Sequence, residues 1–466
     1  MHDVAIIGAG PGGFDAAMHA HELGFKVALI EKSSVGGTCL NTGCIPTKAL
    51  LAASKLLTQI KNAQSFGISV TGLSWDLQAM TERKNRIVET LGKGMGETLR
   101  RLGIERINGA ASFASKNKLS VTRDGKTQEI EARFILIAAG SEPAPFPGVP
   151  FDGKKILSST DLLESQPLPK SLLILGGGVV GVEFASIFQP LGVKITIVEM
   201  LERLLFNEDE EVGRRFESLF RRKGIEVLTG EKVKGLFTGA DSIAAILESG
   251  KKIEAERVLV AIGRRPRLES LTLEKAGIRT VKGAIEVNEF LETSASGVFA
   301  IGDVTNRTTG LAHAASAEGI RVVENLKGPA KRKMDYTAIP SCIYTDPEVA
   351  SVGVTSSSRP ILPARAKLGR HGQEALESKV LFSALGKSQV EGETEGFIKM
   401  IAAKKDGRIL GVTGIGGRMT ELVAEAALAV RNGLTVKALA QTVHAHPTES
   451  EILQKAAERL LRLMEQ

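Results

Sequence analysis

Residues 4–13 of the chain read VAIIGAGPGG, a short apolar run that passes directly into a glycine-rich turn. Apolar residues at helical spacing follow, and a second apolar run over 27–30 ends at Glu31. The order of strand, glycine-rich turn, helix, strand and acidic residue predicts a complete βαβ unit. Three glycines have the G-x-G-x-x-G spacing of a dinucleotide-binding loop: Gly8, Gly10 and Gly13.

Each glycine of such a loop has its own physical task. The first permits a tight turn, the second lets the backbone approach a pyrophosphate, and the third lets the helix pack on the strand. The N-terminus of the helix would then bind the phosphates, and Glu31 would bond the hydroxyl groups of a ribose.

The same pattern recurs further along the chain. An apolar run over 172–175 leads into a second glycine-rich turn and a helical pattern, and a strand over 193–198 ends at Glu199. Glu199 favours NAD over NADP, because a carboxylate bonds a free 2′-hydroxyl but repels a 2′-phosphate. Arg203 follows closely, and an arginine near this position is usual in NADP sites. The glycines of the second turn are Gly176, Gly178 and Gly181.

Three further apolar runs end in glycine in the manner of a strand that approaches a ligand. They cover 134–139, 258–262 and 298–301, and they lead into Gly140-Ser141, Gly263-Arg264 and Gly302-Asp303. A glycine at the carboxyl end of a short strand allows the backbone to lie close to a ligand at the edge of the sheet.

Residues 37–48, GTCLNTGCIPTK, contain two of the three cysteines, Cys39 and Cys44. A regular helix holds positions five apart about 8–9 Å from each other at Cα, whereas a disulfide tolerates at most about 7 Å. If the two cysteines pair, the segment between them must leave helical geometry, and Asn41 and Gly43 are residue types that tolerate this. A strained, accessible disulfide at a helix N-terminus would be redox-active.

The cysteines also allow two other interpretations. They could be inert and buried, or they could form half of a metal site. A metal site needs more ligands, and Cys342 is the only cysteine that remains.

Composition excludes several classes of function. The formal net charge of +7 is mild for 466 residues, and the chain has no basic tail, so we expect no nucleic-acid partner. No run approaches about 18 apolar residues, so we expect no membrane span. The N-terminus lacks the pattern of an export signal, and an odd cysteine count argues against a secreted disulfide framework. We therefore expect a cytoplasmic protein, where a disulfide is usually catalytic.

The character of the chain changes after residue 339. Apolar runs over 342–344, 397–401 and 410–412 predict strands of a mainly antiparallel sheet. Two amphipathic patterns predict helices over 421–431 and 449–464. The poorly periodic segment 355–376 is predicted to be a loop.

Residues 444–451 read HAHPTESE and allow two interpretations of Glu451. Thr448 and Glu451 fit the capping-box pattern of the helix that follows. Alternatively, Glu451 orients His446 and raises its basicity, which would give a general acid/base for thiol chemistry. The spacing alone leaves both open.

These motifs together resemble the flavoprotein pyridine nucleotide-disulfide oxidoreductases, and within that family the branch that oxidises dihydrolipoyl groups with NAD. The resemblance extends over nearly the whole chain, although segment 355–376 departs from the usual acidic helix. It is carried by both glycine-rich turns and by residues 36–50, 301–303, 344–348 and 444–451.

The resemblance implies an α/β fold with two Rossmann-like dinucleotide-binding domains, for FAD and for NAD, and a C-terminal α+β dimerisation domain. The expected boundaries are 1–144 for the first part of the FAD domain, 145–266 for the NAD domain, 267–337 for the return to the FAD and central domain, and 338–466 for dimerisation.

It also implies roles for individual residues. Cys39 would be the interchange thiol that reacts with the lipoyl group, and Cys44 would face the flavin as a charge-transfer thiolate. His446, with Glu451 behind it, would reach Cys39 of the partner subunit, so that the dimer would be obligatory. Lys48 would lie near the flavin N5.

The remaining cofactor contacts follow from the same resemblance. Glu183 would pair with Lys48, Asp303 would bond the ribityl chain of FAD, and Gly263 and Arg264 would border the NAD site. Further expected cofactor-binding positions are Gly37, Thr38, Ala111, Ser141, Val233 and Ala312.

The implied partners are a second copy of the chain and the lipoyl domains of a 2-oxoacid dehydrogenase acyltransferase or a glycine-cleavage carrier protein. One alternative is an NADPH-dependent reductase of glutathione type. A mercuric-ion reductase would need a second cysteine pair near the C-terminus, and no cysteine follows Cys342. A non-catalytic FAD-containing structural or binding subunit would need neither the cysteine pair nor His446.

Overall fold

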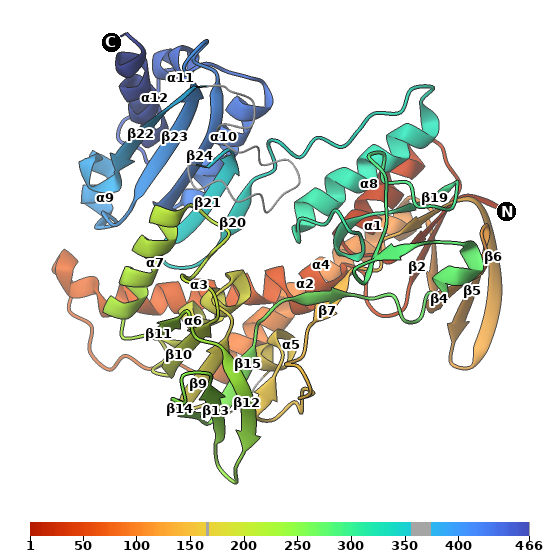
Figure 1. The fold of residues 1–466 in the computed structure, drawn as a ribbon, viewed down its shortest axis with the longest axis horizontal. Coiled ribbons are helices and arrows are strands. Elements are labelled where there is room, and N and C mark those ends of the chain that lie inside the picture. Colours follow the sequence, from red (N-terminus) through yellow and green to blue (C-terminus); the bar gives the residue numbers. More distant parts are fainter. Residues whose placement is uncertain (165–166, 356–373, 466) are drawn as a thin grey trace. The chain divides into compact units, whose positions relative to one another are not determined.

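The structure is a computed structural model that describes residues 1–164, 167–355 and 374–465. These residues form two compact units, which are drawn in Figure 1. The first unit comprises 1–50, 76–144 and 263–334. The second comprises 51–75, 145–262 and the chain from residue 335 onward.

A parallel sheet forms the centre of the first unit. Its strands lie in the order β3-β2-β1-β6-β19, and every neighbouring pair is parallel. Most of β1, all of β2 and β19 and the carboxyl end of β6 are buried, which agrees with their continuous apolar runs, whereas β3 at the edge of the sheet is mostly exposed. Their bounds are β1 His2–Ile7, β2 Val27–Glu31, β3 Glu105–Asn108, β6 Lys126–Ile137 and β19 Val298–Ala300.

Strand β6 belongs to two pairings. Its carboxyl half pairs with β1 and β19, and its amino half forms an antiparallel meander with two further strands. These are β4 Ala110–Ser115 and β5 Lys118–Arg123. Two small antiparallel pairs complete the unit, β7 Ser141–Pro143 with β16 Arg264–Pro266 and β17 Thr280–Val281 with β18 Ala284–Ile285.

Helices α1 and α8 lie side by side in the first unit, and small residues allow their close approach (Figure 1). A Cβ atom on Gly319 would lie 2.5 Å from the carbonyl oxygen of Gly12, and one on Gly12 would lie 2.8 Å from that of Ala315. The helices here are α1 Pro11–Glu22, α2 Gly37–Thr42, α4 Leu77–Arg101 and α8 Ala312–Lys327, with short 3₁₀ turns η2 Leu273–Ala276 and η3 Gly302–Val304. Helix α3, Cys44–Lys61, begins in this unit.

The second unit contains another parallel sheet, in the order β11-β10-β9-β15-β8. A three-stranded antiparallel sheet, β12-β13-β14, accompanies it. The strands are β8 Ile156–Leu157, β9 Ser171–Leu175, β10 Lys194–Glu199, β11 Glu226–Thr229, β12 Val233–Thr238, β13 Ile243–Leu247, β14 Lys252–Ala255 and β15 Arg257–Val260. The helices are α5 Ser159–Leu163, α6 Val179–Phe188 and α7 Glu210–Arg222, with the 3₁₀ turn η1 Ala63–Phe66.

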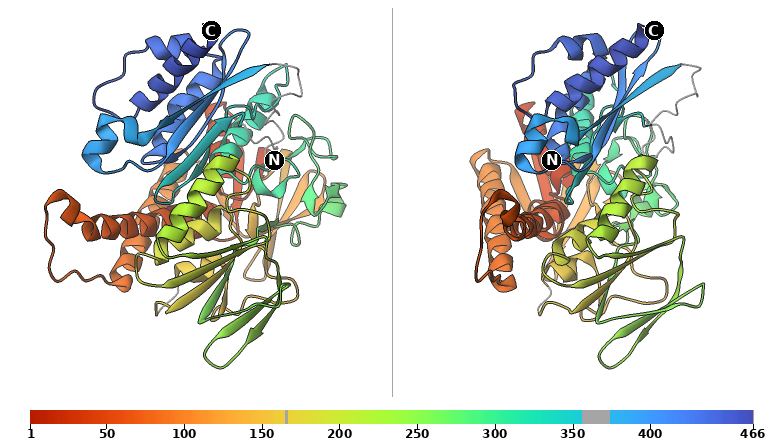
Figure 2. Two further views of the ribbon diagram at one scale, coloured as in Figure 1. Left: turned by 60° about the vertical axis from the view of Figure 1, so that its left-hand side comes forward. Right: turned by 90° about the vertical axis from the view of Figure 1, so that its left-hand side faces the viewer.

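The C-terminal part of the second unit is an antiparallel sheet in the order β20-β21-β24-β23-β22, and helices α10 and α12 pack on it (Figure 2). The strands are β20 Ser341–Ile343, β21 Glu348–Gly353, β22 Ala375–Leu381, β23 Phe397–Ala403 and β24 Ile409–Gly416. The helices are α9 Gly386–Glu391, α10 Met419–Arg431, α11 Val436–Gln441 and α12 Glu451–Met464, with the 3₁₀ turn η4 Phe382–Ala384.

The fold class predicted from the sequence is confirmed, since two parallel sheets with glycine-rich turns precede an antiparallel sheet. One prediction needs correction. The expected loop over 355–376 lies mostly outside the described residues, but Ala375 and Leu376 belong to β22, where they pair with Ala403 and Ala402. Cross-strand pairing overrides weak local periodicity at that end. Among the described residues, no helix has both the length and the apolar character needed to cross a bilayer.

The close contact between α1 and α8 predicts opposite effects for two glycine substitutions in helices. Gly319→Ala forces a methyl group against the backbone of Gly12 and should destabilise the protein by about 1–3 kcal/mol. Gly94→Ala, in the exposed part of α4 where nothing lies within 4 Å, should stabilise it by about 0.5–1 kcal/mol through helix propensity. Urea midpoints of the two variants measure this, and equal midpoints would contradict the close packing.

Candidate redox-active site

The two cysteines lie on either side of a break between two helices. Cys39 is in the six-residue helix α2, and Cys44 is the first residue of α3. Gly43 makes the break, with φ −140° and ψ −107°. A Cβ atom at Gly43 would lie 2.9 Å from the carbonyl oxygen of Thr38, so a side chain does not fit there. The predicted departure from helical geometry is therefore present.

Asn41 has a different role from the one expected. It stays helical, and its amide Nδ2 donates to the carbonyl oxygens of Val35 at 3.1 Å and Gly37 at 2.8 Å. These bonds fix the turn in which Gly36 and Gly37 have φ of +93° and +54°. Asn41 thus holds the start of α2, and the distortion falls on the glycines, which adopt it at little steric cost.

The start of α2 is joined to the first glycine-rich loop. The Gly36 N–H donates to the carbonyl oxygen of Ala9 at 2.7 Å. A Cβ atom on Gly37 would lie 2.7 Å from the Cα of Gly10, so the two backbones touch. The cysteine segment and the dinucleotide loop are therefore a single piece of structure, and Thr38 lies in the first turn of α2 beside it.

Both cysteines are partly buried thiols, and a side-chain hydrogen bond joins them. This bond, followed by burial and by repulsion from Cys44, raises the pKa of the Cys39 thiol far above its ordinary value. The charge of Lys48, one turn further along α3, acts in the opposite direction. Loss of the Cys39 proton is therefore disfavoured while this thiol is hydrogen-bonded to Cys44.

The two glycine-rich loops are built in the same way. In the first, a Cβ atom on Gly13 would lie 1.9 Å from the carbonyl oxygen of Gly8; in the second, one on Gly181 would lie 2.0 Å from that of Gly176. Only glycine allows the helix to begin so close to its strand. Gly8 and Gly176 have φ of +102° and +107°, the left-handed region that favours glycine.

Each loop is held by the acidic residue that ends the neighbouring strand. Glu31 Oε2 accepts from the Ala9 N–H at 2.8 Å, and Glu199 Oε2 accepts from the Gly177 N–H at 2.6 Å. The other oxygen of each carboxylate accepts from the N–H two residues later, Ser33 and Leu201, at 2.8 Å in both cases. The acids thus shape the loops, and the ribose contacts predicted for them stay a prediction.

Three predicted residues from distant parts of the sequence meet in the first unit. Ser141 Oγ donates to Asp303 Oδ2 at 2.5 Å and accepts from Arg264 Nε at 2.7 Å. Arg264 Nη2 also donates to the carbonyl oxygen of Ser141 at 2.9 Å. Burial lowers the pKa of the Arg264 guanidinium, and the Asp303 carboxylate opposes that effect. The cluster forms where β7 pairs with β16, directly after Gly263.

The other predicted cofactor contacts have the following places. Ala111 is buried in β4, Val233 is the first residue of β12, and Ala312 is the first residue of α8. Glu183 is buried in α6, and its Oε1 accepts from the Tyr344 N–H at 3.0 Å. The expected pairing of Lys48 with Glu183 stays a prediction.

The Glu451 carboxylate makes one contact of each kind that the sequence suggested, and its acid/base role toward His446 stays a prediction. Its Oε1 lies 3.0 Å from His446 Nδ1, and its Oε2 accepts from the Thr448 N–H at 2.9 Å. The second bond is half of a capping box. The other half is absent, because Thr448 Oγ1 contacts the carbonyl oxygen of Ala445 at 2.7 Å and Ser450 Oγ at 2.9 Å. The bond with His446 lowers the pKa of the Glu451 carboxyl.

His446 is exposed over 75% of its side chain, whereas His444 is exposed over only 5%. His444 lies 2.9 Å from both Glu425 Oε1 and the carbonyl oxygen of Thr442. The His444 imidazole is therefore held by two partners inside the protein, whereas the His446 imidazole is open to solvent, and its reaction with a partner stays a prediction.

Sequence reasoning missed Glu318, which is almost completely buried in α8. Its Oε2 accepts from the Gly302 N–H at 2.7 Å and so fixes the turn that carries Asp303. The available signal was an acidic residue among alanine and glycine within a helix. Glu208 and Asp209, both buried, were missed for a different reason: a charge in a short connection gives no periodic pattern.

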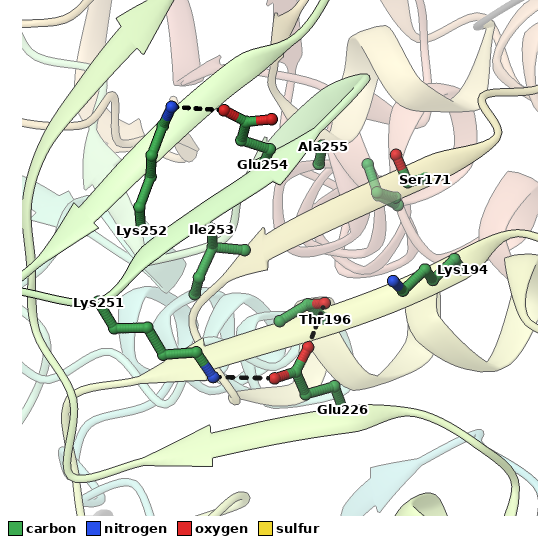
Figure 3. Close-up of a pocket in the computed structure, with 10 residues that line it drawn as sticks. Ser171, Lys194, Thr196, Glu226, Lys251, Lys252, Ile253, Glu254 and Ala255 are labelled. Carbon is green, nitrogen blue, oxygen red and sulfur yellow. Dashed lines mark hydrogen bonds and ion pairs between the residues drawn. The ribbon is translucent and has the colours of Figure 1, made fainter.

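A pocket of about 180 Å³ in the second unit does not belong to this chemistry. Figure 3 shows Ser171, Lys194 and Glu226 along it, and these residues begin β9, β10 and β11. Nucleotides bind at the carboxyl ends of parallel strands, where Glu199 and the glycine-rich loop lie. The carboxylates in the pocket already have cationic partners, Lys251 for Glu226 and Lys252 for Glu254.

Two family models cover most of the chain. The model described as pyridine nucleotide-disulphide oxidoreductase matches residues 2–319, and the dimerisation domain of the same family matches residues 339–457. The chain therefore belongs to the pyridine nucleotide-disulphide oxidoreductases.

The relatives within this family are more specific. A dihydrolipoyl dehydrogenase of Chlamydia pneumoniae is 40% identical over 456 residues, which are 98% of this chain and 96% of the relative. One of Bacillus subtilis strain 168 is 39% identical over 471 residues, 98% of this chain and 97% of the relative.

Solved structures agree with this family. LpdA from Mycobacterium tuberculosis has a TM-score of 0.91 and 25% identity, with 99% of this chain and 100% of that chain covered. The HOCl-induced flavoprotein disulfide reductase RclA from Escherichia coli has a TM-score of 0.85 and 28% identity, with 98% of this chain and 99% of that chain covered.

These similarities confirm the sequence predictions of family, fold class and cofactors, and they support one of the predicted partners. The family and the fold class are as expected. FAD and NAD are the cofactors of the family and of the dihydrolipoyl dehydrogenases. The match to a dimerisation domain supports a homodimer.

The double use of Glu451 predicts different results for two substitutions. Glu451→Gln keeps an oxygen for the Thr448 N–H but removes the charge beside His446, so it should lower kcat/KM about 10- to 100-fold with little loss of stability. Glu451→Ala removes both bonds and should also destabilise the protein by about 1 kcal/mol. Steady-state kinetics and urea unfolding measure the two effects; a fully active Glu451→Gln variant would refute the role toward His446.

Proposed function

We propose that this protein oxidises protein-bound dihydrolipoyl groups to lipoyl groups and reduces NAD⁺ to NADH. The observation that supports the proposal most directly is the pair of thiols, Cys39 and Cys44, at a helix break attached to a dinucleotide loop. The similarity to dihydrolipoyl dehydrogenases over 98% of the chain supports the choice of substrate.

The loops fit the two dinucleotides. The crowded glycines lie next to the strands, but the middle ones face open space. A Cβ atom on Gly178 would meet no heavy atom within 4 Å, and one on Gly10 would meet only the Cα of Gly37 at 4.0 Å. Backbone N–H groups are thus accessible to a pyrophosphate at the start of α1 and of α6.

The first loop, with Ser141 and Asp303, would hold FAD, and the second, with Glu199, would hold NAD. A bound flavin would supply a two-electron acceptor for the dithiol and a hydride donor for NAD⁺. Arg203 does not face a 2′-phosphate, because its Nη2 donates to the carbonyl oxygens of Phe206 and Glu208 at 2.7 and 3.0 Å. This supports NAD over NADP.

The thiol chemistry takes place in two exchanges. One thiolate of the dihydrolipoyl group attacks the Cys39 sulfur of the oxidised pair, which forms a mixed disulfide and releases Cys44 as a thiolate. The second thiol of the substrate then attacks the substrate sulfur of the mixed disulfide. The lipoyl disulfide forms, and Cys39 leaves with the electron pair.

His446 of the partner subunit would take the proton of the second thiol, because only a thiolate attacks. It would return this proton to Cys39 as that sulfur leaves. Glu451 keeps the imidazole oriented through Nδ1, which leaves Nε2 for the thiol.

The physiological partners would be lipoyl domains of a 2-oxoacid dehydrogenase acyltransferase or of a glycine-cleavage carrier protein. Such complexes require a reoxidant for the dithiol that they generate. We place this activity in the cytoplasm, where thiols outside a catalytic pair are kept reduced.

Turnover with dihydrolipoamide and NAD⁺ tests the proposal. The purified protein with FAD should be yellow and should produce NADH, and replacing NAD⁺ with NADP⁺ should lower kcat/KM at least about 10-fold, because Glu199 repels a 2′-phosphate. A preference for NADP⁺ would favour a glutathione-type reductase. No NADH production by protein that holds FAD and is given both substrates would instead favour a non-catalytic binding subunit.

Mixed dimers test the role of His446 across the interface. Cys44→Ser and His446→Gln homodimers should each be nearly inactive. A heterodimer of the two contains one intact site, made of the cysteine pair of one subunit and His446 of the partner subunit. Random reassociation should therefore restore roughly a quarter of the wild-type activity. Mixtures that stay inactive after verified exchange of subunits would show that His446 acts within its own chain.

A further inference from the structure

A short connection in the second unit touches the second glycine-rich loop directly after Glu199. The Leu205 N–H donates to the carbonyl oxygen of Gly177 at 2.9 Å. Leu204 packs on the same glycine, since a Cβ atom on Gly177 would lie 2.3 Å from Leu204 Cδ2. Both leucines are buried, and Leu205 has φ of +48°, a conformation that L residues rarely adopt.

The far end of this connection is fixed to the antiparallel sheet. Glu208 accepts from Ser341 Oγ at 3.0 Å and from Ser351 Oγ at 2.6 Å, on β20 and β21. Asp209 is fully buried and lies 3.1 Å from Lys399 Nζ on β23. We call residues 203–209 the nucleotide tether.

Arg203 braces the tether from within. Its two hydrogen bonds to the carbonyl oxygens of Phe206 and Glu208 close the segment on itself, and its guanidinium lies 4.6 Å from the centre of the Phe206 ring. The tether is therefore stiff, and a displacement at Glu208 would move Leu204 and Leu205.

The first unit uses the matching position of its own loop for catalysis. The Ala9 N–H bonds Glu31, and the Ala9 carbonyl oxygen accepts from Gly36, the start of the cysteine segment. In the second unit the Gly177 N–H bonds Glu199, and its carbonyl oxygen accepts from the tether. The Ala9 carbonyl oxygen thus positions the cysteine segment in the first unit. The equivalent carbonyl oxygen of Gly177 in the second unit instead accepts from the nucleotide tether, which is fixed to the antiparallel sheet.

We propose that Glu208, through Ser341 and Ser351, is a positioning residue for nicotinamide nucleotide binding. The two serines hold the tether against Gly177 and keep the loop in the shape that admits a pyrophosphate. The inference rests on the proposed function only in assigning NAD to the second loop. A buried carboxylate with two hydroxyl donors is suited to this task, because moving it away would leave buried polar groups unsatisfied.

A second contact between the nucleotide-binding part and the antiparallel sheet provides a matched control. Glu395 pairs with Arg215 and Arg222 of α7, at 2.9 Å to Arg222, so it also joins the nucleotide part to the antiparallel sheet. Glu395 has no hydrogen bond or ion pair to the tether in the described structure. Glu395→Ala therefore weakens the attachment of α7 without loosening Gly177.

Calorimetric titration with NADH on the FAD-loaded protein tests the proposal. Glu208→Ala should weaken NADH binding roughly 3- to 30-fold, and Glu395→Ala should change it less than about twofold. The rate at which dihydrolipoamide reduces the protein without NAD⁺ should be the same in all three proteins, since the cysteine segment lies in the other unit. Ser351→Ala, which removes a single hydroxyl, should weaken binding in the same direction and less.

Wild-type NADH affinity in both Glu208→Ala and Ser351→Ala would overturn the proposal, as would an equal loss in Glu395→Ala. If Glu208→Ala does not fold, Ser351→Ala decides alone. Failure of the proposed function is recognised separately: wild-type protein that binds NADH but is not reduced by dihydrolipoamide refutes the substrate and leaves the tether intact.

Discussion

The backbone N–H and carbonyl groups of Ala9 connect the parts of the structure on which the proposed chemistry depends. Its N–H donates to Glu31 and its carbonyl oxygen accepts from Gly36, so one residue joins the acid at the end of β2, the loop at the start of α1 and the segment that carries the cysteines. The arrangement requires glycine in the loop and in the cysteine segment. A Cβ atom at Gly8 would lie 2.3 Å from the carbonyl oxygen of Ala138, and one at Gly37 would lie 2.7 Å from the Cα of Gly10. Steric exclusion therefore fixes where the sulfurs lie relative to the loop.

Repetition of this device gives the protein its division of labour. Both loops use a carboxylate to hold a backbone N–H, and both present an open glycine beside it. They differ in which segment donates to the carbonyl oxygen of the same residue, Ala9 or Gly177. The cysteine segment occupies it in the first unit, and residues 203–209 occupy it in the second. Under the proposed function, one architecture would thus support a thiol reaction in one unit and a nucleotide reaction in the other.

Much of the fold could be predicted from the sequence, because glycines at fixed spacing between apolar runs have few structural solutions. The strands ending at Glu31 and Glu199 and the helix break at Gly43 are of this kind. Ser141, Arg264 and Asp303 could each be predicted as site residues, but their contact with one another could not. That contact depends on the pairing of strands that are distant in sequence. Glu208 could not be found, because a charge in a short connection gives no periodic pattern, and Glu318 left only the weak signal of an acidic residue among alanine and glycine in a helix. The loop predicted over 355–376 was wrong at its C-terminal end, because β22 is formed by pairing with β23 and not by a local sequence pattern.

The carboxylate of Glu451 limits how this region of the protein can change in evolution. Each of its oxygens has a separate partner, the imidazole of His446 and the backbone of Thr448. Aspartate is one methylene too short to span both, and glutamine keeps the reach but loses the charge. Neither aspartate nor glutamine can therefore replace Glu451 without losing one of its interactions. Orthologues that retain the histidine should retain glutamate as well, even where the surrounding surface has diverged.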